Sequence, residues 1–142
     1  ILLLAGTIPL GLAIQQLGLA DQAAGTLIAA VGDANPWLLI GTIYLLTSVT
    51  TELLSNNATA VLFTPIGISI AQELGVDPMI FVFAVIFAAN CSFATPMGYQ
   101  TNLLVMGPGH YKFADFFKAG APLVLLLWII FSLFAPFYYG LM

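Results

Sequence analysis

Residues 50–59 read TTELLSNNAT, a polar stretch between apolar segments that cover 36–54 and about 58–72. Its centre, Ser55-Asn56-Asn57, predicts a break in the helix, because short polar side chains compete for backbone hydrogen bonds. No charged connecting loop separates the two apolar segments, so we interpret 36–74 as a re-entrant helical hairpin. Lipid-exposed loops do not occur at membrane depth, and the tip is therefore predicted to line a cavity.

The composition indicates a membrane protein. Of the 142 residues 61% are hydrophobic and only 6% are charged, and the mean hydropathy is +1.09, whereas a soluble domain has about 25% charged residues. A membrane-spanning helix needs about 20 apolar residues. The charged residues leave five runs that cross or nearly cross a bilayer, at 1–20, 34–51, 53–72, 78–111 and 119–142. The sequence thus predicts an all-α polytopic membrane protein.

Several classes of function are excluded by the same composition. Two cationic residues and a net charge of −4 give no basic surface for nucleic acid, which is bound through its phosphates. The single cysteine, Cys91, allows no internal disulfide, and no Cys/His cluster suggests a structural metal. No Ser/His/Asp set or carboxylate pair converges, so the chain is not expected to be an enzyme. The chain starts inside an apolar segment without an initiator Met, and we expect it to be a piece of a longer protein.

The other segments are predicted from apolar periodicity and from breaks. Residues 19–31 have the helical spacing of a short interfacial helix, and 78–107 is predicted to be a helix interrupted at 94–99, where Pro96 and Gly98 free backbone groups. We expect the rest to comprise a segment at 1–16 broken by Pro9, a loop at 110–118 and a final transmembrane helix at 119–140.

The two breaks provide complementary dipoles. A helix that begins in a break directs N–H groups towards the cavity and favours anions, whereas a helix that ends there offers carbonyl oxygens to cations. A carboxylate within the bilayer, here Glu52, is costly and is a candidate for function. For Glu52 we favour a structural anchor that holds the tip, and a proton-carrying role is the alternative.

The motifs Ser55-Asn56-Asn57-Ala58-Thr59 after Thr51-Glu52, and Ala94-Thr95-Pro96 before Thr101-Asn102, resemble the C-terminal repeat of the divalent anion/sodium symporters. That family transports sulfate, citrate and other dicarboxylates. The resemblance covers essentially all of 1–142. It implies one membrane-embedded transport domain fragment, half of an inverted-repeat transporter with a re-entrant hairpin and a discontinuous helix.

The resemblance also implies residue roles, a coupling ion and partners. We expect sodium as the coupling ion and no other cofactor, a multi-pass protein of the cell membrane, and a homodimer. By position, the sodium ligands are Thr51, Leu54, Asn56 and Ala94, of which Leu54 and Ala94 use backbone carbonyls. The residues implied for the anion are Ser55, Asn56, Asn57, Thr95, Pro96, Thr101 and Asn102.

The sequence departs from the family at two positions that bear on the substrate. Asn57 stands where many members have Thr, and Met97 to Gln100 lengthen the second break. Both departures favour a sulfate-like or an uncharacterised anion over a dicarboxylate. The two lysines lie away from the breaks, so a dianion there needs bound cations to balance its charge, and sodium prefers such neutral oxygens.

The expected function is sodium-coupled symport of a small divalent anion by alternating access. Two alternatives stay open at this point. One is a proton-coupled or exporter-type anion carrier of the same superfamily, with Glu52 as its proton carrier. The other is a membrane channel or a structural subunit.

Overall fold

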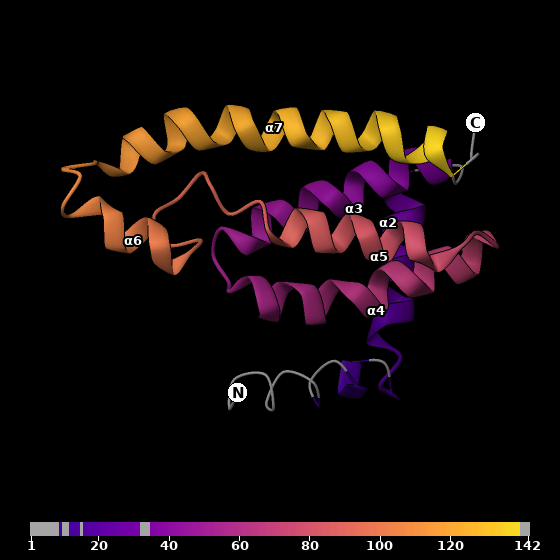
Figure 1. Cartoon of the computed structure of the whole chain (residues 1–142). Coiled ribbons are helices and arrows are strands. Elements are labelled where there is room, and N and C mark those ends of the chain that lie inside the picture. Colours follow the sequence, from indigo (N-terminus) through magenta and orange to yellow (C-terminus); the bar gives the residue numbers. More distant parts are fainter. Residues whose placement is uncertain (1–8, 10–11, 15, 32–34, 140–142) are drawn as a thin grey trace.

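The computed structural model describes residues 9, 12–14, 16–31 and 35–139. Most of the segment predicted at 1–16 lies outside the described residues. Within them the ordered elements are all helical (Figure 1). The helices are α2 (Leu19–Val31), α3 (Pro36–Thr51), α4 (Asn56–Leu74), α5 (Pro78–Ala89), α6 (Gln100–Met106) and α7 (Phe113–Tyr138).

The core lies among α3, α4 and α5, which contact one another (Figure 1). α2 packs against α4, and α7 lies along α3 on the other side. Burial of apolar side chains is the main favourable contribution to such packing. The largest fully buried apolar side chains come from α3, α4 and α5, and they are Leu39, Ile40, Ile43, Tyr44, Ile70, Ile80, Phe81 and Val85.

Local sequence signals set most of the helix ends. Asn35 and Asp77 precede Pro36 and Pro78, and each side chain accepts a hydrogen bond from the backbone N–H two residues on, at 3.2 and 2.9 Å. A proline at the first helical position sacrifices no hydrogen bond there. α4 ends at Leu74 and is capped by Gly75, whose φ of 66° is left-handed and suits glycine. The capping residues in the sequence therefore mark the helix ends that the structure has at these places.

The two breaks lie at different residues from those predicted. α3 ends at Thr51 and α4 begins at Asn56, so the first break covers 52–55 rather than 55–57. Ser55 is the N-cap of α4, and its hydroxyl accepts a hydrogen bond from the Ala58 N–H at 3.3 Å. The polar tripeptide thus starts a helix instead of interrupting one. The second break covers 90–99 and starts four residues earlier than predicted.

The loop predicted at 110–118 is wrong for most of its length, because α7 begins at Phe113. The Asp115 carboxylate accepts a hydrogen bond from the Lys112 backbone N–H at 2.8 Å, which fixes the first turn. Asp115 is also favoured there by the positive end of the helix dipole. The charged residues Lys112, Asp115 and Lys118, which the sequence placed in a loop, are therefore exposed at the start of the last helix.

One described helix is long and apolar enough to cross a membrane, and it covers Phe113–Ala135 within α7. α2 and α3 would count as a second candidate if the bent pair formed one span. α5 is apolar but shorter. The described part therefore has fewer candidate spans than the five charge-free runs, because α3 with 16 residues and α5 with 12 are short for a span.

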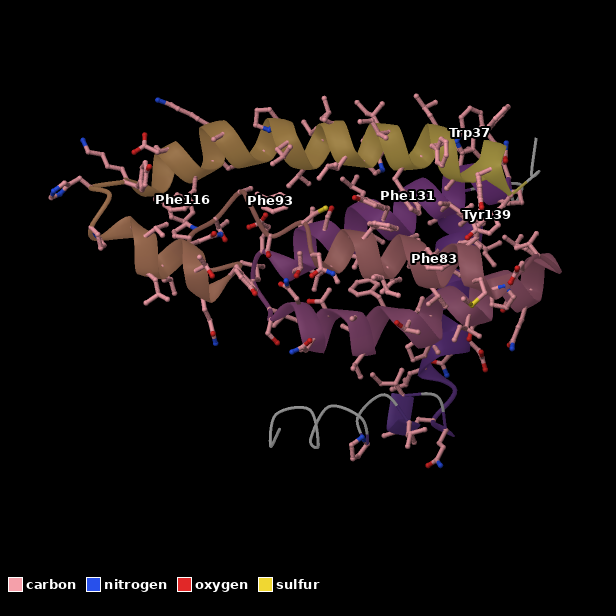
Figure 2. All side chains as sticks on the ribbon, viewed as in Figure 1. Trp37, Phe83, Phe93, Phe116, Phe131 and Tyr139 are labelled. Atoms are coloured by element: carbon pink, nitrogen blue, oxygen red, sulfur yellow. The ribbon has the colours of Figure 1, made fainter. Side chains whose placement is uncertain are left out.

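α7 docks on the bundle through tryptophan donors and one close backbone approach. Trp128 Nε1 donates to the Gly41 carbonyl at 2.8 Å, and Trp37 Nε1 donates to the Ser132 carbonyl. The Phe131 ring lies between α7 and the bundle, 5.0 Å from the Tyr44 ring (Figure 2). At the other end of α7, a Cβ on Gly120 would overlap the Phe93 main-chain carbonyl. The glycine lets α7 touch the second break.

Replacing Gly120 with alanine should lower the stability of the full-length protein by about 1–3 kcal/mol, because the new methyl group meets rigid main chain. Thermal unfolding of the purified protein in detergent measures the effect. Gly25→Ala is the matched control. A Cβ at Gly25, inside α2, meets nothing within 4 Å, and the change should stabilise by about 0.5–1 kcal/mol. Equal unfolding temperatures for Gly120→Ala and the natural protein would contradict the close approach.

Candidate functional site

The two breaks lie together at one end of the bundle. α3 and α5 both end there and α4 begins there (Figure 1). The Thr51 hydroxyl, which is fully buried, donates a hydrogen bond to the Ala89 carbonyl at 2.8 Å. It also lies 3.0 Å from Asn56 Oδ1. One hydroxyl thus connects the last residues of α3 and α5 to the first residue of α4.

The Glu52 carboxylate joins the first break to the second. Oε1 accepts a hydrogen bond from the Ala94 backbone N–H and Oε2 accepts one from the Thr95 N–H, both at 2.8 Å. Glu52 is only 8% exposed. Hydrogen bonds to a charged acceptor are stronger than those between neutral groups. A residue of the α3–α4 connection therefore satisfies two donors that the unwound segment after α5 would otherwise leave without partners.

Side chains of the second break complete this network. Thr95 Oγ1 donates to the Glu52 carbonyl and accepts from the Gly98 N–H, both at 3.0 Å. Asn102 Nδ2 donates to the carbonyls of Ser92 and Thr95, at 3.0 and 3.1 Å. A Cβ on Gly98 would lie 2.9 Å from Glu52 Oε2, so a side chain there would press on the carboxylate. The segment 92–98 is irregular yet closely held.

Two cavities open between the breaks. The larger, of about 400 Å³, is lined by Leu53, Leu54, Ser55, Asn56, Asn57, Asn90, Met97, Gly98, Tyr99 and Gln100. The smaller, of about 130 Å³, is lined by Asn56, Asn90, Ser92, Phe93, Tyr99 and Asn102. Their polar side chains are amides and hydroxyls, and none carries a formal charge. An uncharged polar cavity lined by both breaks is the candidate site.

The predicted site residues fall into two groups. Five of them line a cavity. Leu54, Ser55, Asn56 and Asn57 line the larger cavity. Asn102 lines the smaller cavity, which Asn56 also lines. The other five line neither cavity. Thr51, Ala94 and Pro96 are buried, Thr95 is partly buried in the hydrogen-bond network, and Thr101 is exposed. Their ligand roles stay predictions.

Four polar lining residues were missed by sequence reasoning. Asn90 and Tyr99 line both cavities, Gln100 lines the larger and Ser92 lines the smaller. Asn90 follows the last residue of α5, and its position four residues before the predicted break at 94–99 made it look like helix interior. For Tyr99 and Gln100 the sequence did offer a signal, namely the lengthened segment 97–100. Extra polar residues in a helix break are available to line the cavity that the break forms.

The electrostatics of the site come from helix ends and from no cationic side chain. Both lysines of the sequence, Lys112 and Lys118, are exposed at the start of α7. α4 points its N-terminus, and α3 and α5 their C-termini, towards this end of the bundle (Figure 1). The N-terminus favours anions and the C-termini favour cations. Such an arrangement can hold an anion and a cation side by side.

The chain matches one family of transporters and several individual transporters. Residues 1–141 match the family described as citrate transporter. An uncharacterised transporter of Synechocystis is 47% identical over 99% of this chain and 23% of its own length. A probable sodium/sulfate cotransporter of Chlamydomonas reinhardtii is 32% identical over 84% of the chain and 14% of its own length. The Na⁺/citrate cotransporter of the rat is 29% identical over 89% and 22%. The chain spans less than a quarter of each of these relatives.

The Glu52→Gln substitution tests the link between the breaks. Glutamine would direct an NH₂ group at one of the two backbone N–H donors, so one donor loses its acceptor. We expect a cost of about 1–3 kcal/mol, measured as a lower unfolding temperature of the full-length protein.

Glu73→Gln is the matched control for Glu52→Gln. Glu73 is exposed in the last turn of α4, and its substitution should change stability by less than about 0.5 kcal/mol. If both variants unfolded at the temperature of the natural protein, the carboxylate would not be holding the two breaks.

Proposed function

Because this chain belongs to the citrate transporter family, a family of transporters and not of enzymes, we propose that the full-length protein is a sodium-coupled symporter of a small divalent anion. Members of such a family are membrane proteins, and the proposed place of this one is the cell membrane, with several spans and as a homodimer. The observation that carries the proposal is the uncharged polar cavity lined by both helix breaks.

A dianion in this cavity needs positive charge that the lining residues do not provide. Helix N-termini and amide donors contribute partial charges only. A bound cation supplies the remainder, and sodium prefers the hydroxyl, amide and carbonyl oxygens found here. Coupling follows directly, since an anion that binds well only beside sodium is carried only with sodium.

The proposed sodium site uses the oxygens between the ends of α3 and α5. Thr51 Oγ1 and Asn56 Oδ1 lie 3.0 Å apart, and the carbonyls of Leu54 and Ala94 complete the set. The anion is proposed to bind in the adjoining cavity against Ser55, Asn56 and Asn57 at the start of α4. Thr95, Pro96, Thr101 and Asn102 support this site from the second break.

We propose sulfate or a similar small anion as substrate in preference to citrate. The carboxamide of Asn57 fills more of the cavity than a hydroxyl would, and it both donates and accepts hydrogen bonds. Relatives whose names state a substrate include both a sodium/sulfate and a Na⁺/citrate cotransporter. Their similarity to this chain supports an anion and sodium, and the choice of sulfate depends on Asn57.

Transport would proceed by alternating access, with the α3–α4 hairpin as a re-entrant element that carries the site from one face of the membrane to the other. The bonding of Glu52 favours its anchoring role here. Both of its oxygens accept backbone hydrogen bonds, so a proton on either oxygen would displace one of them.

Replacing Asn56 with alanine should abolish sodium-dependent sulfate uptake, because Asn56 contributes to both proposed sites. Uptake is measured in vesicles that contain the full-length protein, with a sodium gradient, and the amount of protein in the membrane is measured in parallel. Gln72→Ala, an exposed change near the end of α4, is the control and should transport normally.

Three other outcomes of the uptake experiment would overturn the proposal. Unchanged uptake by Asn56→Ala would remove this residue from the site. Uptake that ignores sodium and follows a pH gradient would indicate a proton-coupled carrier. Flux that neither saturates nor depends on an ion gradient would indicate a channel.

The Asn57→Thr substitution should shift preference from sulfate towards a dicarboxylate such as succinate. A shorter side chain leaves more room in the cavity, and such pocket changes alter selectivity about tenfold or more. The ratio of kcat/KM for the two anions measures the shift. Asn57→Ala is the matched control, which removes the polar group and should weaken uptake of both anions. An unchanged ratio in Asn57→Thr would separate Asn57 from anion choice.

A further inference from the structure

A third cavity lies among the start of α7, the connection between α6 and α7, and the second break. Its volume is about 460 Å³, and it is lined by three aromatic side chains, one carboxylate and three small or aliphatic residues of α7. Cavities that hold small molecules have volumes of about 300 Å³ or more. This cavity is therefore large enough for a ligand of its own.

The aromatic rings form walls that suit an organic cation. The Tyr111 and Phe116 rings lie with their centroids 5.9 Å apart and their planes at 72°, so they meet as the two sides of a corner. Phe93, from the second break, lines the same cavity and lies with Phe116 beside α7 (Figure 2). The faces of aromatic rings carry partial negative charge, and cages of such rings bind alkylammonium groups.

The position of the Tyr111 ring is fixed before any ligand binds. A Cβ on Gly109 would overlap this ring, so the ring lies directly on the glycine. The Tyr111 backbone N–H donates to the Met106 carbonyl at 3.1 Å, which closes the turn after α6. A side chain that is already in place loses little conformational entropy on binding. This wall of the cavity is thus preorganised.

The Asp115 carboxylate gives the cavity a negative charge. Its Oδ2 accepts the hydrogen bond from the Lys112 backbone N–H, and its Oδ1 accepts none from the residues that the structure describes. Neither Lys112 nor Lys118 lines the cavity. A carboxylate oxygen beside three aromatic rings attracts a cation and disfavours an anion. The charge of the cavity is therefore complementary to an ammonium group.

The cavity lies at the depth where the headgroups of a bilayer meet its hydrocarbon. The candidate span begins at Phe113, so Asp115 and Phe116 belong to its first turn. Tyrosine is enriched at this interface, and Tyr111 lies just before the span. Leu123, which also lines the cavity, is eight residues after Asp115, or about 12 Å further along the helix. The lining thus changes from charged and aromatic at the interface to aliphatic deeper in the membrane.

We propose that this cavity binds the ammonium headgroup of a zwitterionic phospholipid such as phosphatidylethanolamine. The ammonium group contacts Asp115 Oδ1 and the rings of Tyr111, Phe116 and Phe93, and the glycerol end of the lipid lies towards Leu123. A soluble amine would leave this aliphatic end of the cavity unfilled, and for this reason the lipid is favoured. The inference goes beyond the proposed symport and does not depend on it.

A bound lipid would also connect to the candidate site. Phe93 lines both the lipid cavity and the smaller cavity between the breaks. Gly120, another lining residue, lies against the Phe93 main-chain carbonyl. A headgroup held between Phe93 and α7 would therefore stabilise the second break in its irregular conformation. We expect its binding to be visible as an increase in the stability of the folded protein.

The experiment measures the unfolding temperature of the purified full-length protein in detergent as phosphatidylethanolamine is added. Phosphatidylglycerol with the same acyl chains is added in a parallel series. A ligand that binds the folded state stabilises it, so phosphatidylethanolamine should raise the unfolding temperature at concentrations where phosphatidylglycerol does not. Ethanolamine hydrochloride, added without lipid, tests a soluble amine as the ligand.

Two variants remove the groups that recognise the ammonium ion. Asp115→Asn removes the charge, and its amide oxygen can still accept the Lys112 N–H that starts α7. Tyr111→Leu removes one aromatic wall. Each variant should need about tenfold more phosphatidylethanolamine for the same shift. Phe134→Leu is the matched control, because Phe134 is an exposed aromatic residue of α7 that does not line this cavity. It should respond as the natural protein does.

Three outcomes would overturn the lipid site. The first is equal stabilisation by the two phospholipids, which would indicate a requirement for acyl chains only. The second is an unchanged lipid requirement in both Asp115→Asn and Tyr111→Leu. The third is full stabilisation by ethanolamine alone, which would assign the cavity to a soluble amine. None of these measurements involves sodium or sulfate, so failure of the lipid site and failure of the proposed symport are distinguishable.

Discussion

The contact between the Glu52 carboxylate and the backbone N–H groups of Ala94 and Thr95 is the interaction on which the site depends. An irregular segment in an apolar environment has donors that water cannot satisfy, and each costs free energy if left unpaired. One side chain from the first break satisfies two of them in the second. The same contact holds the breaks side by side, so that the cavity between them has a fixed wall.

Around this contact, the partial charges of helix ends take the place that charged side chains have in many binding sites. α3 and α5 end and α4 begins at the same place, which brings partial charges of both signs together. Neutral amides and hydroxyls line the space. A site built this way binds a dianion weakly unless cations accompany it, and weak binding of the anion alone is a condition for tight coupling. In the proposed symport, the low content of cationic residues favours coupling, because a bound cation is then needed to balance the charge of the anion.

Prediction from sequence succeeded where local signals dominate. Asn35-Pro36 and Asp77-Pro78 marked helix starts, and 19–31 forms a helix as its periodicity indicated. It failed at two local caps, because Ser55 and Asp115 bond to backbone N–H groups three residues away and so mark helix starts that the sequence reasoning placed elsewhere. It also failed where tertiary contact decides, because Asn90 lines the cavity only since α5 stops against Thr51.

The sequence alone determined that this is a helical membrane protein with two polar breaks, since its hydropathy and its capping residues are local properties of the chain. Only the tertiary structure decided which polar groups face the cavity and which are used to hold it. Thr95 and Asn57 are similar candidates in the sequence, but Asn57 lines the larger cavity and Thr95 lines neither cavity. Their roles differ because hydrogen bonds between segments some 40 residues apart commit some groups to the backbone and leave others facing the cavity.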